Sequence, residues 1–104
     1  MAGIDLKQVR SQITIQMVLD LLGFAPVARI GIRLRGPCPI HAASGPQSRS
    51  FSVNLRSHRY RCFRCHSAGT QLDLWAAVHG RSIHAAASDL CARCGIPVPY
   101  LNSE

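Results

Sequence analysis

The chain has 104 residues, 47% of them hydrophobic, and carries twelve Lys and Arg against five Asp and Glu, for a net charge of +7. This length fits one domain with a modest core, and the apolar content excludes wholesale disorder. No apolar run approaches the roughly 20 residues of a membrane span, and no signal peptide is visible, so we expect a cytoplasmic protein with no membrane partner. Eleven of the twelve cations are Arg, whose planar guanidinium suits phosphate, which favours a nucleic-acid partner.

The first predicted element is a helix over residues 13–22. Its apolar residues recur at helical spacing, and Gly23 provides the stop: Ile13, Met17, Val18, Leu21 and Leu22. Asp5 can open a short helix ahead of it, but residues 1–12 are mostly polar. The sequence therefore predicts a single domain over residues 1–104, with a core at 13–98 and flanking tails at 1–12 and 99–104. We assign the helix at 13–22 a packing role.

Three alternating segments follow, at residues 29–35, 50–55 and 58–62, and each predicts a strand. Their apolar faces are Ile30, Ile32 and Leu34, then Phe51, Val53 and Leu55, then Tyr60 and Cys62. If these faces pack together, the other face of the sheet collects Arg33, Arg35, Ser50, Ser52, Asn54, Arg59 and Arg61. A solvated sheet face is a common alternative. We favour a binding surface, because solvated faces usually mix both signs of charge and this one is only positive.

Two short ligand pairs lie between and after these strands. Cys38-Pro39-Ile40-His41 and Cys62-Phe63-Arg64-Cys65 are separated by twenty residues. A pair with two intervening residues can reach adjacent corners of a tetrahedron, so two such turns complete a closed zinc site. The spacing predicts one structural Zn²⁺ ion on Cys38, His41, Cys62 and Cys65.

Two helices are predicted after the second pair. The first begins at Thr70, with Asp73 three residues on as in a capping box, and ends at Gly80. The second runs from Ile83, after Ser82, to about Cys94, and Gly95 ends it. The predicted fold class is α+β: a small zinc ribbon with a three-stranded antiparallel sheet, flanked by an N-terminal helix and two C-terminal helices.

Cys91 and Cys94 form a third close pair, which allows a rival Cys₄ site with Cys62 and Cys65. Twenty-five residues separate the two pairs, more than a zinc ribbon usually has. Cys91 and Cys94 also fall inside a predicted helix. Burial as small hydrophobic residues is the commoner use of such cysteines, and we prefer it.

No catalytic residues are predicted. Phosphoryl transfer needs acids that converge on Mg²⁺, but the five acids here are scattered along the chain: Asp5, Asp20, Asp73, Asp89 and Glu104. A closed four-ligand zinc site also keeps no open position for an activated water. We therefore expect no enzyme activity from this chain in isolation.

Several motifs together resemble the zinc-binding domain at the N-terminus of bacterial and phage DNA primases. They are Gly36-Pro37-Cys38-Pro39-Ile40-His41, Ser50-Phe51-Ser52-Val53 and Tyr60-Arg61-Cys62-Phe63-Arg64-Cys65, with helical segments that extend the resemblance over residues 13–98. The resemblance implies a zinc ribbon, the same four ligands, and contact with single-stranded template DNA where RNA primers start. Arg64 and His66 stand where the family usually has Gly. The family's polymerase domain is absent, so we expect a stand-alone module that acts with a separate catalytic chain or serves a mobile element.

Two functions remain open. In the first, the chain is a DNA-binding module for replication, in which Arg33, Arg35, Arg59, Arg61 and Arg64 hold phosphates while Tyr60 or Phe63 stacks on bases. In the second, zinc is purely structural and the Ala-rich last helix docks a separate primase, polymerase or helicase chain.

Overall fold

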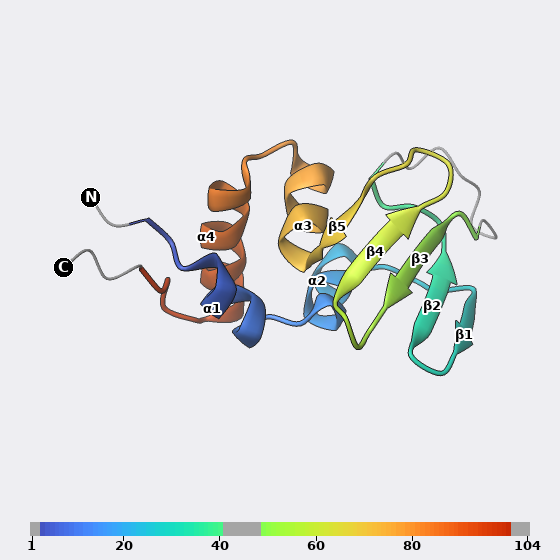
Figure 1. Ribbon diagram of the computed structural model, residues 1–104, viewed down its shortest axis with the longest axis horizontal. Coiled ribbons are helices and arrows are strands. Elements are labelled where there is room, and N and C mark those ends of the chain that lie inside the picture. The colour runs from blue at the N-terminus through green and yellow to red at the C-terminus, as the bar shows by residue number, and fades with distance from the viewer. Residues whose placement is uncertain (1–2, 41–48, 101–104) are drawn as a thin grey trace.

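The computed structural model describes residues 3–40 and 49–100, and these residues form an α+β fold (Figure 1). Its elements are α1 (Leu6–Gln12), α2 (Ile15–Leu22), β1 (Ala28–Ile30), β2 (Arg33–Gly36), β3 (Phe51–Asn54), β4 (Arg59–Cys62), β5 (Ala68–Thr70), α3 (Gln71–His79) and α4 (Ile83–Cys94). The strands form one antiparallel sheet in the order β1-β2-β3-β4-β5. The predicted class is confirmed, with five strands in place of three.

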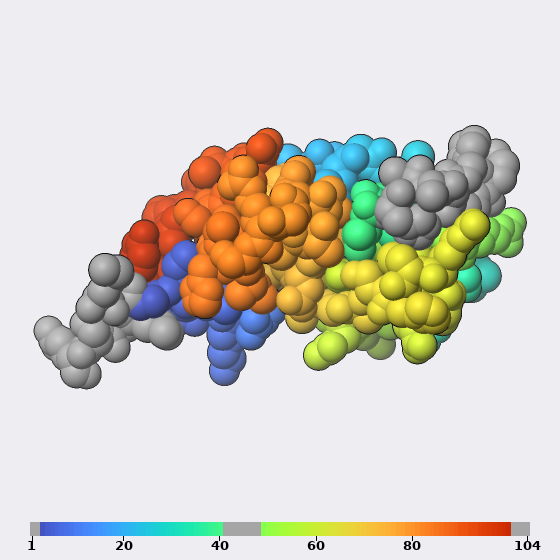
Figure 2. All heavy atoms as spheres, turned by 90° about the horizontal axis from the view of Figure 1, so that it is seen from above, coloured from blue at the N-terminus to red at the C-terminus, as the bar shows by residue number. Residues whose placement is uncertain are grey.

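The sheet occupies one end of the molecule, and α1, α3 and α4 occupy the other (Figure 1). Seen from above, the orange α3 and α4 lie over one part of the molecule, while the yellow and green segments of the sheet region lie at its other end (Figure 2). Helix α3 contacts both β4 and β5 and so joins the two halves. No helix among residues 3–40 and 49–100 is long and apolar enough to cross a membrane.

Local sequence explains where the helices begin and end. Thr14 and Ser82 accept backbone N–H groups at the starts of α2 and α4. At the start of α3 the Asp73 carboxylate accepts the backbone N–H of Thr70 at 2.8 Å. These contacts satisfy amide groups that have no partner inside the helix, so they set the direction in which each helix leaves its loop.

The segment before residue 13 is part of the fold, although the sequence predicts a tail. Asp5 caps α1, and Val9 of this helix is fully buried in the core. The backbone N–H of Asp5 donates to Pro99 O at 2.8 Å, and Ile4 pairs with Tyr100. The described parts of the two flanking segments therefore lie side by side.

The predicted strand at 29–35 is in fact a hairpin. Gly31 has a φ of +60° at the first position of the two-residue loop that joins β1 to β2. Glycine adopts this conformation without steric cost, and hairpin loops of this length require it. The reversal places Ile30 opposite Arg33, with 79% of Ile30 exposed, and Arg29 opposite Leu34. The prediction that Ile30, Ile32 and Leu34 share a buried face holds only for Leu34, because Ile32 lies in the hairpin loop and is exposed as well.

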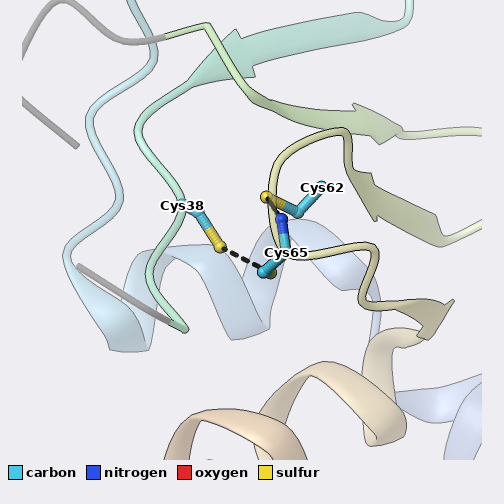
Figure 3. A group of neighbouring side chains, drawn as sticks. All are labelled: Cys38, Cys62 and Cys65. Carbon is cyan, nitrogen blue, oxygen red and sulfur yellow. Dashed lines mark hydrogen bonds between the residues drawn. The ribbon is translucent and has the colours of Figure 1, made fainter. Parts of the chain in front are cut away.

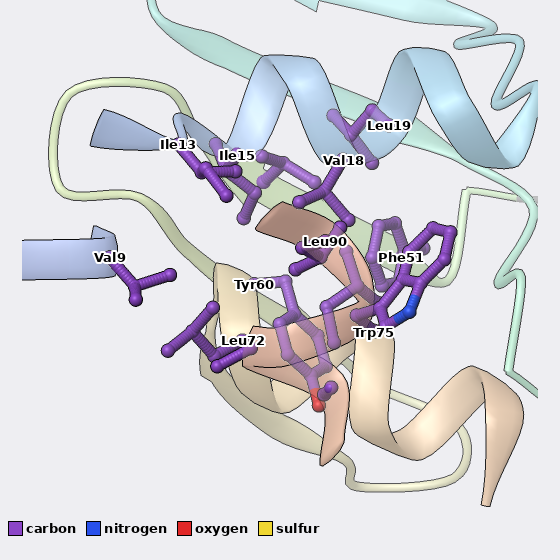
Figure 4. Packing of buried hydrophobic residues seen from close by; sticks show 14 of the residues in the cluster. Val9, Ile13, Ile15, Val18, Leu19, Phe51, Tyr60, Leu72, Trp75 and Leu90 are labelled. Atoms are coloured by element: carbon purple, nitrogen blue, oxygen red, sulfur yellow. The ribbon is translucent and has the colours of Figure 1, made fainter. Parts of the chain in front are cut away.

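The apolar face of the sheet packs against α2 and α3 (Figure 4). Phe51 stacks on Tyr60 with ring centroids 5.5 Å apart and meets Phe24 edge-on at 5.4 Å. Gln71, only 1% exposed, is a buried polar side chain in this region. Its amide donates to Arg10 O at 3.0 Å and to Ile13 O at 2.8 Å, which fixes the α1–α2 junction to α3.

Candidate metal centre and nucleic-acid interface

Three cysteines from separate parts of the chain meet beside the sheet (Figure 3). Cys38 follows β2, Cys62 ends β4, and Cys65 lies in the turn after β4. Their sulfur atoms all lie within 4.8 Å of one another, and the Cys38 and Cys65 Sγ atoms are 3.9 Å apart. Sulfurs at the corners of a tetrahedron with Zn–S bonds of about 2.3 Å are separated by about 3.8 Å. The cluster therefore has the spacing that zinc requires.

Backbone amides stabilise these sulfurs as thiolates. Ile40 N–H donates to Cys38 Sγ, and Cys65 N–H donates to Cys62 Sγ, both at 3.4 Å. Burial acts to raise the pKa of Cys62, but the backbone N–H groups of Cys65 and Arg64 outweigh it and lower the pKa to about 7. The tight turns thus position the ligands and favour the charged form that binds metal.

The fourth predicted ligand, His41, lies outside the described residues. Three thiolates are soft ligands suited to zinc, and a fourth donor would close the tetrahedral shell of a structural site. In this protein zinc supplies a cross-link between strand ends.

The rival site with Cys91 and Cys94 is not assembled in the described part of the chain. There, Cys38, Cys62 and Cys65 are the only group of three or more potential ligands whose donor atoms lie close together. Cys91 is fully buried on α4, and burial raises the pKa of its thiol. A buried protonated thiol packs as a small apolar group, as predicted, whereas Cys94 is only half-buried.

His66 follows the last cysteine in an unusual backbone conformation. Its φ is +63°, in the left-handed region where glycine is favoured. This explains physically why the resemblance places Gly here. His58, at the β3–β4 turn, also has a positive φ, of 55°, and its Nδ1 accepts the backbone N–H of Ile15 at 3.2 Å. Sequence spacing gave no sign of this contact between the hairpin and the start of α2.

The polar face of the sheet carries two rows of side chains across the strands. Arg33 pairs with Asn54 and Asn54 with Arg59, while Arg35 pairs with Ser52 and Ser52 with Arg61. Directly paired residues of antiparallel strands share a face. The five strands contain five Arg and no acidic residue. The register thus brings together four of the predicted DNA-binding residues, namely Arg33, Arg35, Arg59 and Arg61.

Phe63 extends this face at the second cysteine pair. Its ring is 51% exposed, and the guanidinium carbons of Arg35 and Arg61 lie 5.1 and 5.2 Å from its centroid. Arg35 also donates from Nε and Nη2 to Arg49 O, at 3.0 and 2.6 Å. These contacts hold two cations in fixed positions beside an aromatic ring. Arg64, also predicted as a contact, is exposed on the same turn.

Tyr60 does not offer a stacking surface. It is 4% exposed, its ring stacks on Phe51 on the core side, and its hydroxyl lies 2.9 Å from Ser67 Oγ. The role is wrong for Tyr60 because residues along a strand alternate between faces, and its neighbours Arg59 and Arg61 take the outer one. Of the two rings predicted to stack on bases, Phe63 is the exposed one.

The polar face contains a hollow of about 330 Å³. Its lining residues come from β2, β3, β4, β5 and the second cysteine pair: Arg33, Ser52, Asn54, Arg59, Tyr60, Arg61, Phe63, Ala68 and Gly69. Asn54 was not among the predicted contacts. Its pairing with Arg33 and Arg59 is the signal that identifies it, and this pairing requires the register of the sheet.

Comparisons with known proteins agree with this geometry. The sequence profile of the CHC2 zinc finger, the zinc ribbon of DnaG-type primases, matches residues 3–104. The chain therefore belongs to this family, and the cysteine cluster is its structural zinc site.

A solved structure is also similar: the crystal structure of the Aquifex aeolicus primase, described as containing zinc binding and RNA polymerase domains. It is 26% identical with a TM-score of 0.72, and the alignment covers 94% of this chain and 23% of the Aquifex chain. This chain thus spans about a quarter of that protein. No curated protein matches.

Proposed function

We propose that this domain binds single-stranded DNA through the polar face of its sheet and contacts the template when primers are initiated. One observation carries the proposal: the register lines up Arg33, Arg35, Arg59 and Arg61 across β2, β3 and β4 with no carboxylate among them. Such a surface attracts the DNA backbone through phosphate contacts and counterion release. Membership of the primase zinc-ribbon family supports DNA as the polyanion.

The positions of the cysteines indicate a structural role for zinc in this domain. Zinc on Cys38, Cys62 and Cys65, with His41 as the proposed fourth ligand, ties the end of β2 to the end of β4. This cross-link holds the two Arg-bearing strands on either side of β3. In this proposal zinc keeps the binding surface in register and takes no part in chemistry.

Catalysis is assigned elsewhere. The described acids Asp5, Asp20, Asp73 and Asp89 lie on or cap four different helices, and no group of three or more carboxylates comes together in the described residues. We infer that primer synthesis needs a polymerase domain, and that a primase or helicase is the protein partner. Zinc-binding thiolates persist in a reducing compartment, so we infer a cytoplasmic location.

We favour DNA binding over docking of a partner on the Ala-rich last helix, because one face of α4 is buried in the domain itself. Ala86 and Ala87 are fully buried in the domain's own core, together with Leu90 and Cys91. The polar sheet face, by contrast, carries exposed cations, among them Arg33, Arg59 and Arg61.

Fluorescence anisotropy tests the proposal directly. The zinc-loaded protein is titrated into labelled single-stranded and double-stranded oligonucleotides of the same sequence over a salt series. We expect tighter binding to the single strand, with an affinity that falls by about 0.7 log units per log unit of salt for each phosphate contacted. No binding at low salt, or an affinity unaffected by salt, would contradict the proposal.

A further inference from the structure

The hollow on the polar face is lined by side chains that mostly donate hydrogen bonds. Arg33, Arg59 and Arg61 contribute guanidinium groups, which have donors and no acceptor. Ser52 adds a hydroxyl, which can donate or accept. In the described residues the one ion pair joins Arg93 to Asp89 on α4, so none of these three Arg is paired with a carboxylate there.

Asn54 adds a donor whose direction is fixed. Its Oδ1 accepts the backbone N–H of Arg56 at 2.9 Å and of Ser57 at 3.0 Å. These two bonds settle which end of the amide is the oxygen, because the nitrogen cannot accept. The other end of the amide, Nδ2, has two hydrogens to donate. It is the part of the Asn54 side chain that remains available to a ligand in the hollow that Asn54 lines.

The size of the hollow suits a single nucleotide. Its volume of about 330 Å³ is at the lower end of the roughly 300–1,000 Å³ that ligand pockets occupy. Phe63, which is 51% exposed, forms part of the wall together with Arg61, whose guanidinium lies over the ring, and a base can stack on an aromatic ring or on a guanidinium plane.

Donor-rich walls discriminate between bases. Thymine and guanine present a carbonyl oxygen at the exocyclic position where cytosine and adenine present an amino group. An amino group facing Asn54 Nδ2 and the guanidinium groups meets donors only and finds an acceptor in the hollow only if it reaches Ser52 Oγ, and an unpaired polar group in a binding site lowers affinity.

We propose that this hollow holds one unpaired base of the DNA strand and prefers keto bases, thymine and guanine, over amino bases, with Asn54 as a specificity-determining residue. This inference rests on the proposed single-strand binding. It adds a base preference that the Arg rows alone would not produce, since phosphate contacts carry no sequence information.

The test compares oligodeoxyuridine with oligodeoxycytidine of equal length, using anisotropy with the zinc-loaded protein at fixed salt. Uracil and cytosine differ at the exocyclic 4-position and the adjoining ring nitrogen, and neither carries the thymine methyl. We expect the uridine strand to bind about three to ten times more tightly, the effect of one or two hydrogen bonds gained or lost.

Asn54→Asp is the decisive variant. An Asp side chain keeps an oxygen for the N–H groups of Arg56 and Ser57 but replaces the donor with an acceptor. Its added charge weakens binding to both strands, so the readout is the ratio of the two affinities. We expect the uridine preference to disappear or reverse. Gln8→Glu, the same chemical change on the exposed side of α1, is the control and keeps the preference.

The outcomes separate the two proposals. Equal affinity for both strands in the wild type, or a ratio unchanged by Asn54→Asp, overturns the base preference while single-strand binding stands. Failure of the wild type to bind either strand overturns the proposed function itself. Zinc content and circular dichroism of each variant show that a changed ratio comes from a folded domain.

Discussion

At the scale of single residues, His66 adopts a left-handed backbone conformation that is unfavourable for a residue other than glycine. The turn after Cys65 needs a left-handed residue, and a side chain with a Cβ pays roughly 1–2 kcal/mol there. His66 has a φ of +63° and is exposed, so its side chain gains little from packing. A strained non-glycine residue beside a binding surface is a common feature of functional sites.

We predict that His66→Gly stabilises the zinc-loaded domain by about 0.5–1 kcal/mol, because relief of strain exceeds the added entropy of the unfolded chain. Urea unfolding followed by circular dichroism measures the change. The same substitution at His84, exposed in the first turn of α4, is the control and should not stabilise, since no left-handed strain is relieved there and glycine is the poorer helix former. Loss of stability in His66→Gly would mean that the imidazole makes a stabilising contact.

The lowered pKa of Cys62 predicts how zinc binding responds to pH. Below a pKa of about 7 its thiol must lose a proton to bind metal, and above it the thiolate already exists. Zinc affinity should therefore rise with pH, and the number of protons released per zinc should fall by one as the pH passes through about 7. Competition with a chelator across pH 6–8 measures the slope. A constant slope through this range would contradict the assignment.

At the scale of elements, the sequence predicted the helix starts, which depend on neighbouring residues. It did not predict strand β5, which depends on pairing with another strand. The first residues of α3 and α4 are predictable because Thr70, Asp73 and Ser82 bond to backbone or side-chain groups close by in the sequence. Strand β5 has three residues, Ala68-Gly69-Thr70, too few for a periodic pattern, and it exists because β4 pairs with it.

The β1–β2 hairpin was missed for a different reason. Residues on both sides of Gly31 alternate between polar and apolar as a strand does, and each side is indeed a strand. The alternation therefore predicts one continuous strand, although the chain reverses direction at Gly31. The Arg rows were predicted for Arg33, Arg35, Arg59 and Arg61 because alternation survives within β2 and β4. Alternation also placed Asn54 on this face, but which residue stands opposite which is set by register, so the pairing of Asn54 with Arg33 and Arg59 emerged only from the structure.

Gln71 is the element-scale contact with the largest expected effect. Its amide bonds to Arg10 O and Ile13 O at the α1–α2 junction, and the side chain is buried. Gln71→Leu leaves these carbonyls without that donor, and we predict a loss of about 1–3 kcal/mol in the free energy of unfolding. Chemical denaturation measures it. Gln16→Leu on the exposed side of α2 is the control, expected within about 0.5 kcal/mol of wild type.

At the scale of the whole molecule, the zinc ligands and the helices act on the same side of the sheet, because Cys62 shares the buried face of β4 with Tyr60 and pairs with Phe51. The cysteine cluster joins β2, β4 and the turn before β5, while α2 and α3 cover the apolar face. The metal thereby replaces core that a domain of this size lacks. No described helix covers the polar face, which we propose as the binding surface.

The metal assignment predicts opposite results for two buried cysteines. Cys38→Ala should abolish zinc binding and unfold most of the sheet, because binding of a structural metal contributes to the free energy of folding. Cys91→Ala, equally buried on α4, should retain one zinc per chain and lose only packing. Metal analysis of the purified variants measures the stoichiometry. Zinc lost from Cys91→Ala and retained in Cys38→Ala would restore the rival site.

The proposed function depends most on contact between the Arg rows of the sheet and DNA phosphates, and one comparison of salt dependence tests this contact. Arg59→Ala/Arg61→Ala removes two exposed cations from β4, and Lys7→Ala/Arg81→Ala removes two exposed cations away from the sheet. The two variants have the same net charge. For single-stranded DNA, each lost phosphate contact lowers the slope of log affinity against log salt by about 0.7. We therefore predict a slope that is shallower by about 1.4 in the first variant and unchanged in the second. Equal slopes in the two variants would contradict binding through this face.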